Sequence, residues 1–487
     1  MEKRDALFIG GKWVASASGK TIDVINPYTE EVMGTVPEAC ETDIDAAVAA
    51  AQKALASGWW RQTTPDERAD MLAAIGAGIM GRAREIADLI TAEMGCPASF
   101  SLAGQALAAG MLLNIFADIV RSFPFQELRQ GVIGPNLVVK QPVGVSAAII
   151  PWNAPLFAAC IKLGAAIGAG SPVVLKPAPE APLDAFVLAE VCEAVGLPAG
   201  MLNVVPAGRE IGEYLVRHPG IDKVAFTGST AAGRRIGAIC GELLKRCTLE
   251  LGGKSAAIVL EDANLEETIS LLLPNAIMNN GQACLAQTRI LAPRSRYDEI
   301  NRALAAAVSA MTVGNPADPS VQVGPLVSES QRQRVEGYLA KGRKEGAAVL
   351  CGGGRPREQK RGWFIEPTLF SNVDNSMTIA REEIFGPVLV TIPFEDQDDA
   401  IRIANDSEYG LSGSVWTRDI TRGIEVAKGV RTGTYGVNAV ATMDIKAPFG
   451  GFKASGLGRE LGPEGVDAFL ETQTIVLPVG YVPGAPH

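Results

Sequence analysis

The sequence predicts an α/β fold with two parallel sheets, each covered by helices, and a smaller β-rich element. Strand-like apolar runs and helix-like segments alternate through residues 145–240, which is typical of parallel strands joined by helices. The alternation restarts near residue 255, after Gly252-Gly253, and so indicates a second α/β domain. A strand-like segment at 471–477 follows the main pattern and predicts a separate β element.

The segments before this alternation predict a mixed N-terminal region. Short strands and turns are expected over 7–36. Helices are expected over 43–56, 65–94 and 98–120. Thr42 is the expected N-cap of the first helix. Residues 131–143 predict a hairpin around 134–136, and we expect the terminal strand 471–477 to pair with this hairpin of a neighbouring subunit.

The alternating segments predict the order of strands and helices in the two sheets. The expected strands lie at 145–150, 173–176, 201–205, 224–227, 255–260, 289–291 and 388–393. The expected helices lie at 155–168, 183–195, 211–217, 230–240 and 297–311. This order favours sheets with helices on both faces.

Charge and composition exclude several classes of partner. The net charge of −10 argues against binding to nucleic acid and against docking on an anionic membrane. Residues 144–175 carry Lys162 as their only charge and so imitate a membrane span. Pro151 and Pro155 interrupt this stretch, which we interpret as a buried strand, a loop and a buried helix.

The cysteines and histidines narrow the chemistry. The eight cysteines lack the spacing of a disulfide framework, which fits reduced thiols in a cytoplasmic protein, and no N-terminal apolar run resembles a signal peptide. Of the two histidines, His487 is terminal and His218 lies in an expected exposed turn, so we predict a structural role for His218. No CxxC or HExxH pattern occurs, and no metal site is expected.

Cys284 is a candidate nucleophile. It follows a turn of small residues in which Gly281 lets the backbone approach closely and expose its amides. A thiol reacts as the thiolate, which needs an electropositive or hydrogen-bonding setting. A single cysteine is more often a small buried apolar side chain, and its local context alone favours that reading.

Two further polar residues allow both a catalytic and a structural reading. Glu250 stands between apolar residues, either on the solvent face of a strand or in a desolvated pocket, where a raised pKa suits a general base. Asn153 follows Pro151-Trp152 and either donates to an oxyanion or closes a turn.

Three segments suggest a dinucleotide cradle. The glycine turn at 228–233 joins an expected strand to an expected helix, whose first amides can meet a pyrophosphate, although its spacing differs from GxGxxG. Lys176 ends a strand and reaches either a ribose or solvent. Residues 382–387 either place a carboxylate on a ribose or form a helix end. A thiol, a base and a dinucleotide together would oxidise an aldehyde through a thioester.

In combination, these motifs resemble those of the hydrolytic NAD(P)-dependent aldehyde dehydrogenases over nearly the whole chain. They are Pro151-Trp152-Asn153, Lys176-Pro177, Phe226-Thr227-Gly228-Ser229, Leu249-Glu250-Leu251-Gly252-Gly253-Lys254, Gly281-Gln282-Ala283-Cys284, Glu382-Glu383-Ile384-Phe385-Gly386-Pro387 and Pro448-Phe449-Gly450-Gly451. The resemblance implies a Rossmann-type cofactor domain, a second α/β catalytic domain and a small β oligomerisation flap, and hence a homodimer or homotetramer. The implied domains are 1–122 with 144–252, then 253–465, and for the flap 123–143 with 466–487.

The resemblance also implies a role for each motif residue. Cys284 would attack the aldehyde, Asn153 and the Cys284 amide would hold the oxyanion, and Glu250 would activate water. Lys162 and Glu460 resemble a pair that relays protons from the base. The implied contacts with the cofactor, NAD with NADP possible, are Ile150, Trp152, Lys176, Pro179, Gly228, Ser229, Gly233, Leu251, Glu383 and Phe385.

Two departures from the family pattern bear on specificity. Pro179 stands where the family carries an acid that binds the adenosine ribose, so we favour NAD and expect NADP to be tolerated. The positions that line the family's substrate tunnel are small or apolar here, which predicts a hydrophobic aldehyde: aliphatic, aromatic or terpenoid. They are Ala154, Ala158 and Ile161, on one helix face, and Phe449.

Two alternatives stay open. A CoA-acylating dehydrogenase would pass the thioester to CoA, and Glu250 argues against it, because acylating members commonly lack that base. A non-catalytic binding protein on the same fold is the other alternative. The combination of Cys284, Glu250 and Asn153 argues against it.

Overall fold

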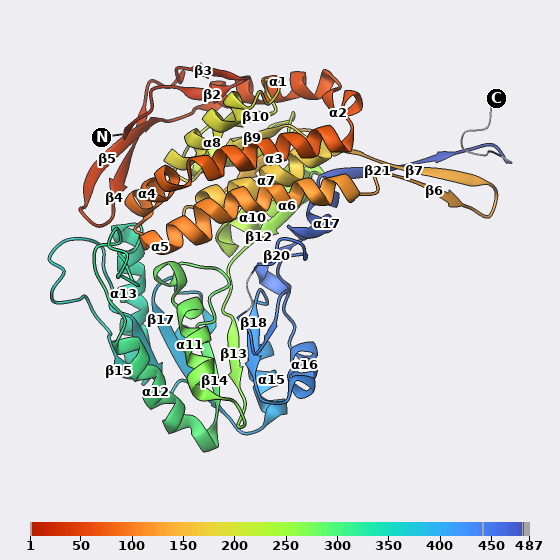
Figure 1. Cartoon of the computed structure of the whole chain (residues 1–487). Helices are drawn as coiled ribbons and strands as arrows, with labels where there is room; N and C mark the ends of the chain where they lie inside the picture. Colours follow the sequence, from red (N-terminus) through yellow and green to blue (C-terminus); the bar gives the residue numbers. More distant parts are fainter. Residues whose placement is uncertain (1, 441–442, 480, 482–487) are drawn as a thin grey trace.

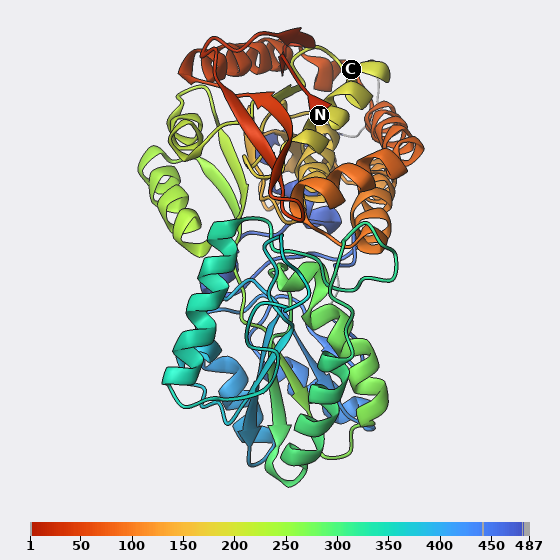
Figure 2. The ribbon, with the colours of Figure 1, turned by 90° about the vertical axis from the view of Figure 1, so that its left-hand side faces the viewer.

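The computed structural model describes residues 2–440, 443–479 and 481. The end of the predicted flap, residues 482–487 with His487, lies outside this part of the chain. The chain forms two stacked α/β halves, and a β arm projects sideways from the first of them (Figure 1). A view turned by 90° shows the same stacking of the halves (Figure 2).

An eight-stranded sheet organises the first half, in the order β20-β12-β11-β8-β9-β10-β2-β3. The strands are β2 (Leu7–Ile9), β3 (Lys12–Val14), β8 (Ser146–Ile149), β9 (Val173–Lys176), β10 (Leu202–Val204), β11 (Lys223–Thr227), β12 (Arg246–Glu250) and β20 (Gly456–Leu457). The strands from β8 to β12 pair in parallel, as the sequence predicts, whereas β2, β3 and β20 pair antiparallel at the edges.

Helices cover both faces of this sheet. One face packs on α3 (Pro65–Gly81), α4 (Ala83–Met94), α6 (Ala108–Ser122), α7 (Pro155–Ala169) and α8 (Leu183–Ala194). The other face packs on α1 (Glu41–Ala56), α9 (Arg209–Arg217) and α10 (Thr230–Leu243). Shorter helices are α2 (Trp59–Gln62), α5 (Ala98–Phe100) and α17 (Gly462–Asp467).

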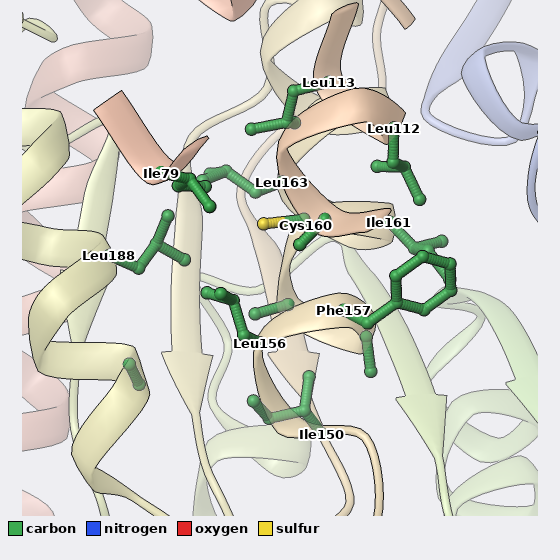
Figure 3. Close-up of a cluster of buried hydrophobic side chains, with 14 of the residues drawn as sticks. Ile79, Leu112, Leu113, Ile150, Leu156, Phe157, Cys160, Ile161, Leu163 and Leu188 are labelled. Carbon is green, nitrogen blue, oxygen red and sulfur yellow. The ribbon is translucent and has the colours of Figure 1, made fainter. Parts of the chain in front are cut away.

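Helix α7 is the centre of the larger core. Apart from Lys162, it is apolar on all sides, and it is buried along its whole length, as expected for a helix enclosed by others. Leu156, Cys160 and Leu163 of α7 lie among Ile79 of α3 and Leu188 of α8 (Figure 3). This packing fixes α7 firmly, and the loop before it carries Asn153.

Two helix predictions are wrong in detail. The expected single helix over 65–94 breaks at Arg82, which leaves helical geometry (φ −110°, ψ 13°) and forms a 2.7 Å ion pair with Glu190 of α8. Thr42 does not cap the first helix, because α1 begins at Glu41 and Cys40 is its N-cap residue. The Asp43 carboxylate accepts the Cys40 amide at 2.9 Å and so satisfies a free donor at the helix start.

The third expected helix includes a π-helical segment. After α5, Ser101–Leu107 forms π-type turns that continue into α6. Within the described residues, Ala98–Ser122 is the only helix long and apolar enough to cross a membrane, with 25 residues and a mean hydropathy of 1.5. It packs against α3 and α7 and buries Leu112, Leu113 and Phe116, so it serves as a core helix.

A seven-stranded sheet organises the second half, in the order β15-β16-β17-β14-β13-β18-β19. Its strands are β13 (Ala256–Val259), β14 (Arg289–Pro293), β15 (Ala348–Cys351), β16 (Thr368–Ser371), β17 (Val388–Phe394), β18 (Gly413–Trp416) and β19 (Gly436–Val437). Its helices are α11 (Leu265–Ala276), α12 (Tyr297–Ser309), α13 (Glu329–Lys344), α14 (Thr378–Arg381), α15 (Gln397–Asn405) and α16 (Ile420–Gly429). All strands pair in parallel except the edge strand β15.

The arm is a three-stranded sheet in the order β21-β7-β6 (Figure 1). Its strands are β6 (Gln126–Gln130), β7 (Pro135–Pro142) and β21 (Leu470–Val476). The hairpin turn lies at 131–134, before the predicted position, because Pro135 already belongs to β7. The terminal strand β21 pairs with the hairpin of its own chain, which corrects the predicted pairing with a neighbouring subunit.

The remaining elements connect the two halves. A small sheet of β1 (Glu2–Lys3), β5 (Glu31–Pro37) and β4 (Thr21–Asn26) flanks the first half. After the second sheet the chain returns: β20 pairs with β12, and α17 packs against α6 and α7. The domain boundaries inferred above stay a prediction, and this return brings residues just before 465 onto the first sheet.

Candidate active site

One pocket of about 300 Å³ lies between the ends of β11 and β12, the start of α7 and the loops of the second half. We call it the central pocket. Its lining includes these residues predicted from the sequence: Trp152, Asn153, Ala154, Ala158, Ile161, Gly228, Ser229, Leu251, Glu250, Cys284, Glu383, Phe385, Phe449 and Glu460. The predicted residues Ile150, Lys162, Lys176, Pro179 and Gly233 are not part of its lining. The structure therefore brings the thiol, the carboxylate and the amide into one cavity.

Cys284 is held by a strained turn. Asn279 and Asn280 adopt left-handed backbone angles (φ 54° and 62°) before Gly281 (φ 74°). A Cβ on Gly281 would lie 2.2 Å from the Gly386 carbonyl oxygen, so only glycine fits there. Burial, with the nearby Glu383 and Glu250, raises the pKa of the Cys284 thiol to about 12, although its own amide and that of Leu285 favour the thiolate.

Glu250 ends β12 in a desolvated position, which decides between the two readings of its sequence context. Its residue is 4% exposed, and neither carboxylate oxygen has a hydrogen-bond partner within the described residues. Burial raises the pKa of Glu250 well above its ordinary value, and the negative charge of Glu460 adds to this effect. A Cβ on Gly450 would lie 2.7 Å from Oε1, so this glycine leaves room for the carboxylate.

A buried ion pair lies next to Glu250. Lys162 on α7 is fully buried, and its Nζ lies 2.6 Å from Glu460 Oε1 and donates to Thr227 Oγ1 at 2.6 Å. Glu460 also pairs through its backbone with Phe449, each amide donating to the other residue's carbonyl at 2.7 Å. These contacts join α7, β11 and the returning C-terminal segment at the central pocket.

Asn153 is tied to the loop that carries Cys284. Its Nδ2 donates to the Gln282 carbonyl at 2.8 Å. Its own carbonyl accepts from Asn279 Nδ2 at 2.8 Å and from Gln105 Nε2 at 3.4 Å. The sequence gives no indication that Gln105 contacts this loop, because Gln105 lies in the π-helical segment, far from Asn153 along the chain.

The loop after α14 supplies a second group of polar contacts. Glu383 Oε1 accepts the Gly253 amide at 3.0 Å. The Phe385 ring packs edge-on against Trp152 with centroids 5.3 Å apart, and its backbone is strained (φ 64°). Gln331 Nε2 donates to the Phe385 carbonyl at 2.7 Å and Arg334 Nη2 to the Glu383 carbonyl at 2.6 Å, and both residues line the pocket. Sequence reasoning missed Gln331 and Arg334, because they lie within a strongly polar helix.

The start of α10 fits the phosphates of a dinucleotide. The Ser229 hydroxyl accepts the Ala232 amide at 3.3 Å and so begins the 14-residue helix α10 beside the pocket. A Cβ on Gly233 would lie 2.3 Å from the Leu251 side chain, so a larger residue would require that side chain to move. Lys176 Nζ is held by the carbonyls of Ala207 (2.7 Å) and Pro177 (3.0 Å), and burial lowers the pKa of Lys176 to about 8.

His218 has a structural setting away from the central pocket. Its Nδ1 accepts the Gly220 amide at 3.0 Å, and its Nε2 lies 3.3 Å from the Asp45 carboxylate. The prediction that His218 is exposed is wrong for its side chain, which is only 16% exposed.

All eight cysteines are free thiols.

Known proteins of similar sequence and structure share one chemistry. The model of the aldehyde dehydrogenase family matches residues 13–475. The geranial dehydrogenase of Castellaniella defragrans is 45% identical over 472 residues, which cover 97% of this chain and 98% of that protein. A Mycobacterium tuberculosis aldehyde dehydrogenase complexed with NAD+ superposes with a TM-score of 0.97 at 51% identity, with 99% of each chain covered.

A further structure is that of a cysteine-to-alanine variant of aldehyde dehydrogenase C from Pseudomonas syringae in complex with NAD+ and octanal. It superposes with a TM-score of 0.94 at 38% identity and covers 99% of this chain and 98% of that one. These similarities span nearly the whole chain, and they agree with a pocket that is lined by both Cys284 and the glycine turn at the start of α10. The chain therefore belongs to the aldehyde dehydrogenase family and is an NAD-dependent oxidoreductase.

Proposed function

We propose that this enzyme oxidises hydrophobic aldehydes to carboxylic acids through a covalent intermediate on Cys284. The observation that carries the proposal is the shared cavity of Cys284, Asn153 and Glu250, in which the base has no hydrogen-bond partner among the described residues. An unpartnered buried carboxylate is costly, and its retention suits a general base.

In the first step the Cys284 sulfur attacks the aldehyde carbon to give a thiohemiacetal. One N–H of the Asn153 amide is engaged by the Gln282 carbonyl, so its second N–H is available to the developing oxyanion. The Cys284 backbone amide supplies the other donor. NAD, when bound, supplies the hydride acceptor that turns the thiohemiacetal into an acyl thioester.

In the second step Glu250 takes a proton from water, and the resulting hydroxide attacks the thioester and releases the acid. The raised pKa of Glu250 makes it a stronger base than an ordinary carboxylate. The Lys162–Glu460 pair lies next to this carboxylate and provides a route for the proton to leave. The Cys284 thiol is restored at the end of the cycle.

The substrate side of the central pocket favours apolar aldehydes. It is lined by Phe157, Ala158, Ile161, Met443 and Phe449. A carboxylate-bearing aldehyde would find no cation among these five side chains to pair with its charge. The similar proteins named for geranial and complexed with octanal support a terpenoid or medium-chain aldehyde.

For the cofactor we propose NAD, with NADP tolerated. Pro179 offers no carboxylate to an adenosine ribose, and the next residue, Glu180, is exposed to solvent. The expected ratio of kcat/KM for NAD over NADP is therefore moderate. A ratio above about a thousand, or about 4 kcal/mol, would contradict this assignment.

We further propose a homodimer or homotetramer in the cytoplasm. The arm ends in Val132 and Ile133, whose side chains are almost fully exposed, and Val476 of β21 is exposed beside them. Exposed apolar side chains in the hairpin turn and on the edge strand β21 favour association with a second copy. The eight free thiols support a reducing compartment.

NADH formation, followed by absorbance against a panel of aldehydes without CoA, tests the function. Octanal, geranial and benzaldehyde are expected to exceed succinate semialdehyde in kcat/KM, and Cys284→Ala is expected to abolish turnover while remaining folded. Preference for succinate semialdehyde would overturn the substrate assignment. Turnover only after addition of CoA would assign the enzyme to the acylating class instead.

A further inference from the structure

Asn279 is a buried residue that does not line the central pocket but bonds to two residues of its surroundings. Its Nδ2 donates to the Asn153 carbonyl at 2.8 Å and to the Gln282 carbonyl at 3.3 Å. The Asn153 Nδ2 donates to the same Gln282 carbonyl at 2.8 Å. The three residues therefore form a closed set of hydrogen bonds. Within it, Asn279 holds both the backbone of Asn153 and the oxygen to which the Asn153 amide is bonded.

The Asn279 side chain acts only as a donor. Its Oδ1 is buried and has no hydrogen-bond partner within the described residues, and a buried amide oxygen left in this way costs free energy. The contribution of the side chain therefore lies in its two N–H bonds. Asparagine also suits the left-handed backbone at this position (φ 54°), so this second, structural role must be separated from the first.

The adjacent residue, Asn280, shares the backbone conformation but has other partners. Its φ is 62°. Its Nδ2 donates to the carbonyls of Gly95 (2.8 Å) and Pro325 (2.9 Å). Its Oδ1 accepts the Gly324 amide at 2.7 Å. These bonds tie the turn to the end of α4 and to the loop before α13, and none of them reaches Asn153.

We propose that Asn279 is a positioning residue for the oxyanion donor: it fixes the Asn153 side chain so that its second N–H meets the oxygen of the Cys284 thiohemiacetal. This role rests on the function proposed for Asn153 above. Because an amide group is planar, a fixed acceptor for one N–H also fixes the direction of the other. Such a donor stabilises the oxyanion only while its direction is held before the reaction begins.

The rate of NADH formation in a single turnover, with enzyme in excess over octanal and NAD saturating, tests this role. Asn153→Ala is expected to slow this step about 10²–10³-fold. Asn279→Gly removes the amide and keeps the left-handed backbone free of strain, and it is expected to slow the step by up to about 10²-fold. In the double variant Asn279→Gly should add less than about a twofold loss, because the side chain that it positions is already absent.

Asn280→Gly is the matched control. It removes three hydrogen bonds from the same turn, so it is expected to lower the Tm, and its effect on the rate should multiply with that of Asn153→Ala. Asn279→Asp repeats the test with the volume of the side chain kept and both N–H donors lost. Fluorescence titration with NAD checks that each variant is folded.

The outcomes separate this inference from the function on which it rests. If the losses from Asn279→Gly and Asn153→Ala multiply, as those of the control do, Asn279 supports the fold alone and the positioning role is overturned, while the role of Asn153 stands. A wild-type rate in Asn279→Gly would have the same meaning. A wild-type rate in Asn153→Ala would overturn the oxyanion role and the positioning role together.

Discussion

Glu250 shows, at the scale of one residue, a conflict between stability and chemistry. Its carboxylate is buried without a hydrogen-bond partner among the described residues, which disfavours the charged form. The same desolvation raises its pKa and makes it a stronger base for water. Replacement of Glu250 by glutamine is therefore expected to lower activity and to raise stability.

For activity, Glu250→Gln is expected to retain the first turnover and lose the later ones. The thioester forms without the base, so a burst of NADH equal to the enzyme concentration remains, whereas steady-state kcat falls about 10²–10⁴-fold. Stopped-flow absorbance measures both phases. Glu299→Gln, an exposed glutamate on α12, is the control and is expected to behave as wild type. Equal loss of burst and steady state would show that Glu250 acts before the thioester.

For stability, the same variant is expected to be more stable than wild type at high pH. The folded chain holds the Glu250 proton to a higher pH than the unfolded chain, so this group's contribution to stability is lost as the pH rises through its raised pKa. Glutamine does not titrate. The gain in Tm of Glu250→Gln over wild type should therefore grow as the pH rises above the ordinary pKa of a glutamate, as measured by calorimetry. A constant gain would contradict the raised pKa.

Ala158 tests the width of the substrate side. Ala158→Leu adds three carbons to the wall of the central pocket without charge. We expect kcat/KM for octanal and geranial to fall about 10–200-fold, while that for acetaldehyde stays near wild type. Steady-state kinetics with the three aldehydes measures this split. A uniform loss for all of them would indicate general damage to the helix instead of a narrower pocket.

At the scale of elements, the buried Lys162–Glu460 pair joins α7 to the returning C-terminal segment. Lys162→Met removes one partner and leaves a buried carboxylate unpaired, which is expected to cost about 3–5 kcal/mol in the free energy of unfolding. Urea titration measures the loss. Lys140→Met, which breaks an exposed pair with Asp467, is the control and should cost about 0–1 kcal/mol. The double variant Lys162→Met/Glu460→Leu should recover much of the stability, and its failure to do so would refute the charge argument.

The elements also show what could be predicted from the sequence. Strand β9 lies where its apolar run predicts it, because a strand buried on both faces has an unmistakable composition. The break at Arg82 was not predicted, and the side chain there forms an ion pair with Glu190, more than a hundred residues away, which no local pattern reveals. Cys40 was not recognised as an N-cap because cysteine is not among the residues preferred at that position, although Asp43 accepts its amide.

In the candidate site, too, residues with a recognisable sequence pattern were predicted, and residues defined by tertiary contacts were not. Cys284, Glu250 and Asn153 were predicted together because the combination of their motifs resembles a known family, whereas each local context alone also allowed a structural role; the structure places all three around one pocket. Gln331 and Arg334 were missed because their link to the site is a hydrogen bond from each side chain to a backbone carbonyl, that of Phe385 and that of Glu383 respectively. Contacts of that kind depend on tertiary packing and leave no local pattern.

At the scale of the whole molecule, the arm is expected to decide the oligomeric state. A variant that ends at residue 469 lacks β21 and exposes the edge of β7, while the lining of the central pocket is complete before that point. We expect a smaller assembly with measurable turnover, from light scattering and NADH formation on the same sample. An unchanged molar mass would show that subunits associate through other surfaces.

The return of β20 to the first sheet has a consequence for synthesis. The edge of β12 stays unpaired until residues 456–457 have been made, after the whole second half. During synthesis on the ribosome, the first half therefore keeps the edge of β12 unpaired. An unpaired strand edge can form hydrogen bonds with other chains and so promotes aggregation. Release of an incomplete chain, for example at a premature stop codon within β18, should give an aggregating product with no functional fragment. In this fold, the eight-stranded sheet is complete only after translation has nearly reached the C-terminus.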